Sequence, residues 1–138
     1  MILSLGFAVL AILLVLVVAA ATAVHLDRKR LLAVADLAAL AAADQVSDRY
    51  FGSAGERGEA GVPLTDATVR AAVDRYVADH PDPAARWDGV RVLEASTPDG
   101  RSARVRLAAV TRPPLVTWVL EPWTGGIALE AEATARAS

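Results

Sequence analysis

The first 24 residues of the chain contain no charged residue and no proline. As an α-helix, a run of this length extends roughly 36 Å, which is enough to cross a hydrocarbon core of about 30 Å. The sequence therefore predicts a transmembrane helix over residues 1–24. A cleaved signal peptide is the alternative, because Ala21-Thr22-Ala23 offers a small-x-small cleavage site. The apolar run is, however, longer than a signal-peptide core of roughly 7–15 residues.

A basic cluster, Arg28, Lys29 and Arg30, follows the apolar run, and we expect it to bind lipid head groups. The next residues, 31–50, are rich in alanine and leucine and contain no proline or glycine, so the helix should continue as a stem over residues 25–50. The positive-inside rule would hold the basic cluster in the cytoplasm. The residues after this cluster have the composition of a soluble domain. We therefore expect a single-pass protein of the cell membrane whose C-terminal domain is extracytoplasmic.

The composition of the chain excludes several classes of function for the residues that follow the anchor. About 110 residues follow the anchor, which is room for one modest domain. The net charge is −2 and the basic residues are scattered, so no nucleic-acid partner is expected. The absence of cysteine excludes disulfides, thiolate metal sites and cysteine catalysis. No spacing typical of a catalytic, cofactor or zinc site occurs, so we expect no enzyme, no cofactor and no metal.

Two segments follow the stem. Residues 51–64 carry glycine at positions 52, 55, 58 and 61, which predicts a flexible linker. Residues 65–138 form the predicted domain, which begins with a helix: Thr65 suits the N-cap, Asp66 suits the first turn and Pro81 ends the helix. The apolar residues of this helix recur at helical spacing on one face, namely Val69, Ala72, Val73, Tyr76 and Val77.

Beyond this helix the apolar period changes from 3.6 to 2, which predicts strands over residues 89–97, 101–112 and 127–136. A turn at Pro98-Asp99-Gly100 would join the first two strands. The residues of the last strand that are expected to face inward are Ile127, Leu129, Ala131, Ala133 and Ala135.

Charged residues on the outer face indicate which strands are neighbours. Arg104 and Arg106 point outward from one strand, and Glu130 and Glu132 do so from another, so these two strands should pair their charges across the sheet. The predicted fold class is α+β and pilin-like. A long N-terminal transmembrane helix continues into a stem and is followed by a small antiparallel sheet packed against an amphipathic helix.

The junction between anchor and stem resembles the N-terminal signature of TadE/TadG-like proteins of the tight-adherence (Flp) pilus-assembly system. In that family a pattern Arg-x-Leu-Gln-x-Ala-Ala-Asp-Ala-Ala-Ala-Leu-Ala-Ala follows the membrane span. Aligned on Asp36, the matching positions are Ala35, Asp36, Ala38, Ala39, Leu40, Ala41 and Ala42, and Arg30 lies one position after the arginine of the pattern. Leu32 stands where the family has glutamine. The resemblance implies a non-enzymatic, membrane-anchored pilin-like or accessory protein of Flp/Tad pilus assembly and secretion. Its partners would be the lipid bilayer and other pilus-assembly subunits or like chains.

Small side chains line one side of the stem and predict a helix-packing interface, because alanine lets two helices approach closely. The residues assigned to this interface are Leu31, Ala35, Asp36, Ala38, Ala39 and Ala42. If Asp36 is buried there it needs a cation, which Arg30 of the same chain or Arg28 of a neighbouring chain could supply. We expect the stripe to contact the stems of like chains or of other subunits.

Between the last two strands, residues 113–126 are too apolar for an ordinary loop, and a short helix is expected over residues 114–120. Trp118 and Trp123 in this segment are candidates for contact with the membrane interface or a partner, or for plugging the open end of the core. The alternative function is a solitary membrane-tethered extracellular binding domain that recognises an envelope component or ligand through these tryptophans.

Overall fold

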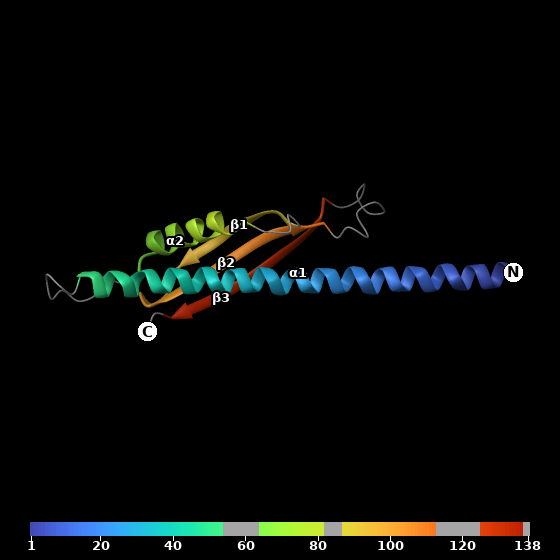
Figure 1. Ribbon diagram of the computed structural model, residues 1–138, viewed down its shortest axis with the longest axis horizontal. Helices are drawn as coiled ribbons and strands as arrows, with labels where there is room; N and C mark the ends of the chain where they lie inside the picture. The colour runs from blue at the N-terminus through green and yellow to red at the C-terminus, as the bar shows by residue number, and fades with distance from the viewer. Residues whose placement is uncertain (54–63, 82–86, 113–124, 137–138) are drawn as a thin grey trace.

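The computed structural model describes residues 1–53, 64–81, 87–112 and 125–136. Its longest element is helix α1 (Ile2–Ser53), which runs unbroken through the predicted anchor and stem (Figure 1). The other elements are helix α2 (Asp66–Asp79) and the strands β1 (Trp87–Ser96), β2 (Ser102–Thr111) and β3 (Ile127–Arg136). We keep the name stem for α1 from residue 25 onward, and call α2 and the three strands together the head.

The three strands form one antiparallel sheet in the order β1-β2-β3. β2 pairs with β3 without interruption, from Ser102 opposite Arg136 to Thr111 opposite Ile127. The β1–β2 ladder contains two register shifts, and Gly89 at the first of them has a φ of 94°, which glycine adopts readily. The predicted antiparallel sheet and its order along the chain are therefore confirmed.

Both helices cover the same face of the sheet. α1 lies over β2 and β3, and α2 lies over β1 beside α1 (Figure 1). The opposite face is open among the described residues and carries the charges of the sheet. Arg104 Nε lies 3.6 Å from Glu132 Oε1, and Arg106 Nη2 lies 3.0 Å from Glu130 Oε2, so the predicted charge pairing between β2 and β3 is confirmed.

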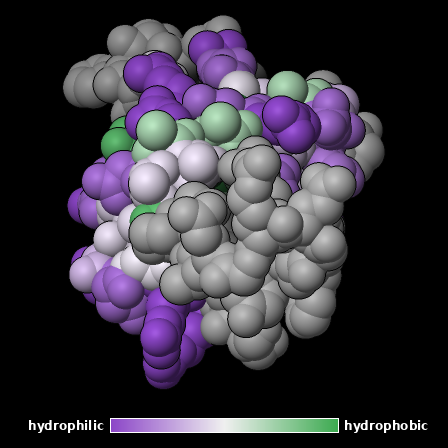
Figure 2. Space-filling model, turned by 90° about the vertical axis from the view of Figure 1, so that its left-hand side faces the viewer, coloured by the Kyte–Doolittle hydropathy of each residue, from purple (hydrophilic) through white to green (hydrophobic). Residues whose placement is uncertain are grey.

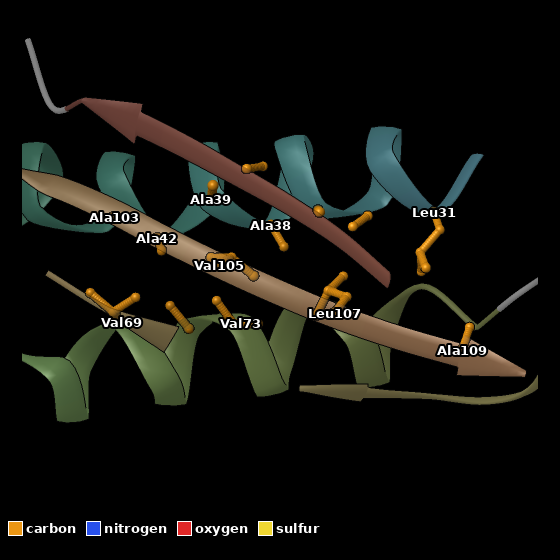
Figure 3. Close-up of a cluster of buried hydrophobic side chains, with 14 of the residues drawn as sticks. Leu31, Ala38, Ala39, Ala42, Val69, Val73, Ala103, Val105, Leu107 and Ala109 are labelled. Atoms are coloured by element: carbon orange, nitrogen blue, oxygen red, sulfur yellow. The ribbon is translucent and has the colours of Figure 1, made fainter. Parts of the chain in front are cut away.

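One apolar core joins the stem to the head. Side chains from α1, α2 and the inner face of the sheet meet in a single cluster (Figure 3). The largest apolar side chains that are completely buried are Leu31, Val69, Val73, Val105 and Leu107. Alanines fill much of the remaining space, which brings the helix and sheet backbones close together. Without α1 the inner faces of β2 and β3 would meet water, so the stem is an integral part of this domain.

The start of α2 is fixed by local hydrogen bonds. The Thr65 hydroxyl accepts from the backbone N–H of Thr68 at 3.3 Å, and the Thr68 hydroxyl accepts from the backbone N–H of Thr65 at 3.1 Å, which forms a capping box. Asp66 accepts from the backbone N–H of Thr97 at 2.8 Å and ties the helix to the end of β1. The predicted N-cap is confirmed, and so is the apolar face, of which Val69, Ala72 and Val73 are buried.

Several details differ from expectation or lie outside the described residues. Ile127 was expected to face inward but is 40% exposed, because it begins β3 at the end of the sheet and no described element covers it. α1 extends to Ser53, and Leu64, expected in the linker, is buried in the core. The rest of the linker, the helix expected over 114–120, and Trp118 with Trp123 lie outside the described residues.

Candidate functional site

The N-terminal part of α1 has the length and composition of a membrane span. Its most apolar 18-residue stretch has a mean hydropathy of 3.1, and none of that stretch is buried within the described structure. The large exposed side chains there include leucines, valines, isoleucines and Phe7. Soluble monomers rarely expose an apolar surface of this extent, whereas a hydrocarbon core would cover it. By length and composition, this helix can cross a membrane.

The small-residue stripe of the stem faces the sheet of its own chain. Leu31, Ala35, Ala38, Ala39 and Ala42 are each no more than 1% exposed, and they lie against β2, β3 and α2 (Figure 3). The sequence predicted that this stripe packs against a helix of another chain. Instead, the head folds back along the stem, and the small side chains permit a close approach to β2 and β3.

Asp36 does not share the buried position of the other stripe residues. Its side chain is exposed, so it needs no buried cation, and the expected pairing with Arg30 is absent among the described ion pairs. The helical turn explains the difference, since Asp36 follows Ala35 by about 100° around the axis and so leaves the face that meets the sheet. Because alanines surround Asp36 in the sequence, the pattern did not show that Asp36 and the stripe lie on different faces of the helix.

A second apolar face runs along the other side of the stem. Leu26, Leu37 and Leu40 are 48%, 51% and 48% exposed, and Ala33 between them is also exposed. Their spacing of seven, four and three residues places them on one side of a helix, opposite the stripe that meets the sheet. We call these four residues the outer leucine face. Of the two apolar sides of the stem, this is the one that the head leaves uncovered.

A buried carboxylate marks the point where the head first meets the stem. Asp27 is 5% exposed, and its Oδ2 accepts a hydrogen bond of 2.6 Å from the hydroxyl of Thr111, which is 1% exposed at the end of β2. Arg30 Nη1 lies 3.5 Å from Asp27 Oδ1. A carboxylate can be buried when a hydroxyl and a guanidinium satisfy its oxygens in this way. The three residues thus fix the end of β2 to the first turn of the stem.

The sequence analysis missed Asp27, although a signal for it was present. Asp27 precedes Leu31 by four residues and Ala35 by eight, so it lies on the same helical face as the small-residue stripe. It also precedes Arg30 by three residues, which is the spacing of an intrahelical ion pair. It directly precedes the basic cluster, whose cations were expected to bind lipid head groups.

The predicted lipid-binding cations are placed at the same level of α1. Arg28 and Lys29 are exposed, while the guanidinium of Arg30 reaches Asp27 and the Arg30 side chain is about half exposed. Exposed cations next to an apolar span are suited to phosphate groups. Lipid binding by the cluster stays a prediction.

The far end of the head is held by a carboxylate in the turn between β1 and β2. Asp99 accepts from the backbone N–H groups of Arg101 at 3.0 Å and Ser102 at 2.6 Å, and from the Ser102 hydroxyl at 2.9 Å. These bonds, led by that from Arg101, hold the pKa of Asp99 below its ordinary value. Seen from this end, much of the described surface is hydrophilic (Figure 2).

A family model matches the N-terminal part of the chain. Residues 1–45 match the model of Tad, the Flp pilus-assembly TadE/G-like family. No curated protein matches the chain, and no solved structure does. The predicted resemblance is thereby confirmed for the anchor and most of the stem, and it supports involvement in Flp pilus assembly. The head lies outside the matched residues.

Proposed function

We propose that this protein is a membrane-anchored, non-enzymatic component of Flp pilus assembly, either pilin-like or accessory. The observation that carries the proposal is that the family match over residues 1–45 coincides with the exposed apolar length of α1 and with the stem on which the head is built. In this role α1 holds the chain in the bilayer, and the head is displayed at the membrane surface on the extracytoplasmic side.

The stem would recruit its partners through the outer leucine face. The small-residue stripe is already covered by the chain's own sheet, whereas Leu26, Leu37 and Leu40 remain exposed and continue the apolar surface of the span. Chains anchored in one bilayer hold their stems parallel, so neighbouring stems can meet along this face. The partners we propose are like chains or other pilus-assembly subunits.

Cysteine cross-linking tests this surface, because the chain has no cysteine of its own. Leu37→Cys places a thiol on the outer leucine face, and Leu93→Cys places one on β1 at a leucine of similar exposure, 47% against 51%. In membranes of cells that make the pilus, we expect Leu37→Cys to cross-link to a second copy or to another assembly subunit. Leu93→Cys should not. Equal cross-linking of both variants, or of neither, would refute assembly through the stem.

Deletion of the protein tests the assignment to the pilus itself. We expect cells without it to lose the surface fibre, and a plasmid copy of the unaltered chain to restore it. A charged replacement on the outer leucine face, Leu37→Glu, should fail to restore the fibre although the protein is present in the membrane. Fibres of normal number in the deletion strain would contradict the proposed function.

The side of the membrane on which the head lies can be measured separately. Arg136→Cys at the exposed end of β3 should react with a membrane-impermeant maleimide applied to intact cells. Reaction only after the cells are lysed would place the head in the cytoplasm, in agreement with the positive-inside rule and against our proposal.

A further inference from the structure

The position of the head along α1 sets its distance from the bilayer. The uncharged run ends at Val24, and Asp27 lies three residues further, or about 4.5 Å along the helix axis. The interfacial layer that carries the lipid head groups is roughly 5–7 Å thick on each side of the hydrocarbon core. Since Thr111 donates a 2.6 Å hydrogen bond to Asp27, the end of β2 would lie at the depth of this layer in a bilayer whose hydrocarbon core ends at Val24.

The ends of all three strands share this level. Trp87 of β1 is the register partner of Thr111, and Thr111 is the register partner of Ile127 of β3. Figure 1 shows the same arrangement, with β2 and β3 reaching about halfway along α1 toward the N-terminus. One row across the sheet is thus held beside the membrane end of the stem.

The chemistry of this row suits a lipid surface. Ile127 is an exposed aliphatic side chain. Trp87 is half-buried and packs against the core, and tryptophan is a residue type enriched at membrane interfaces. Arg112 follows Thr111 directly, its Nη2 lies 2.7 Å from Asp88 Oδ2, and its side chain is 58% exposed.

Among the described residues, the charges at this level are mainly basic or neutralised. Arg28 and Lys29 on α1 are exposed there, and the carboxylates of Asp27 and Asp88 are each paired with an arginine. The glutamates of β3 lie further along the strand: Glu130 is three residues beyond Ile127, or about 10 Å. A surface with this distribution attracts anionic phosphates rather than repelling them.

We propose that the membrane-proximal end of the sheet, with Trp87, Arg112 and Ile127, lies in the phospholipid head-group layer of the bilayer that holds α1. The head therefore rests on lipid and is not held clear of it by the stem. The inference rests on the membrane anchorage of the proposed function, but it adds a lipid-contacting surface to the head itself.

Depth measurements with single-cysteine variants of the full chain test this contact. Ile127→Cys labels the proposed surface, and Arg136→Cys, nine residues along the same strand and about 30 Å away, is the matched control. Leu10→Cys labels the span. Each fluorescently labelled protein is reconstituted into vesicles of phosphatidylcholine and phosphatidylglycerol that carry nitroxide quenchers either on the head group or in mid-chain.

We expect the label at position 127 to lose most of its fluorescence with head-group nitroxides, while the label at position 136 keeps most of its own. Ala128→Cys, also exposed, should behave as Ile127→Cys does and guards against a local disturbance at Ile127. If labels at 127 and 128 are quenched no more than that at 136 while Leu10→Cys is quenched by mid-chain nitroxides, the head stands clear of lipid and only this inference falls. If Leu10→Cys is not quenched in mid-chain, the anchorage falls and the inference with it.

Discussion

The burial of the small-residue stripe against its own sheet makes a quantitative prediction. Ala39 is completely buried between α1 and the strands (Figure 3). Ala33 lies on the outer leucine face and is exposed. Replacing either alanine with leucine adds the same three carbons to the same helix, and both residues are strong helix formers. The two variants therefore differ mainly in what the added atoms meet.

Overpacking a well-filled core costs about 1–3 kcal/mol, because side chains and backbone must shift to make room. We expect Ala39→Leu to lower the free energy of unfolding by about this amount, and Ala33→Leu to change it by less than about 0.5 kcal/mol. For a domain of this size each kcal/mol lowers the melting temperature by about 4 °C. Ala39→Leu should therefore melt about 4–12 °C below the unaltered protein.

Urea and thermal unfolding, followed by tryptophan fluorescence in one detergent at one protein concentration, measure this difference. The same samples should be tested for self-association, for example by cross-linking through Leu37→Cys. Two variants of equal stability, with Ala39→Leu impaired only in self-association, would show that the stripe serves contacts between chains. That result would refute the packing of the stripe against the chain's own sheet.

Three further perturbations have defined outcomes. Thr111→Val keeps the shape of the side chain but removes the donor to the buried Asp27, and we expect it to cost about 1.5–3 kcal/mol of unfolding free energy in the same urea titration. Asp99→Asn removes a carboxylate whose pKa is lowered in the folded state. The contribution of this carboxylate to the free energy of unfolding is therefore present above the ordinary pKa of about 3.9, and it is lost as the pH falls through the lower pKa of the folded state. Melting temperatures measured from pH 5 down to pH 2 should therefore fall more steeply for the unaltered protein than for this variant. Gly126→Ala should be destabilising, because a Cβ there would lie 2.5 Å from Val110 Cγ1 and because Gly126 has a φ of 106°, which residues other than glycine rarely adopt. A melting temperature equal to that of the unaltered protein would contradict the packing at the start of β3.

Periodicity was sufficient to predict the elements and the strand neighbours. The alternation in residues 101–112 and 127–136 marked β2 and β3, and the outward arginines and glutamates predicted their pairing, because opposite charges on adjacent strands stabilise one register. Thr65 and the apolar spacing after it predicted α2 for the same local reasons. Each of these predictions depends on residues that are close together in the sequence or that face each other on adjacent strands.

The partner of the stem could not be read from the same patterns. A stripe such as Ala35, Ala38, Ala39 and Ala42 predicts close packing, but it carries no information on whether a helix or a sheet, or the same or another chain, lies opposite. The decisive contact joins Asp27 to Thr111, which are 84 residues apart in sequence. The exposure of Ile127 likewise depends on where the sheet ends relative to α1.

The continuity of α1 has a mechanical consequence. Because one unbroken helix both contains the candidate membrane span and forms part of the head's core, there is no joint among residues 2–53 at which the two could move separately. A force that draws the head outward would pull directly on the anchor, and a rotation of the anchor would turn the head through the same angle. If the chain were extracted from its membrane, the anchor and the head would thus move together as one rigid body.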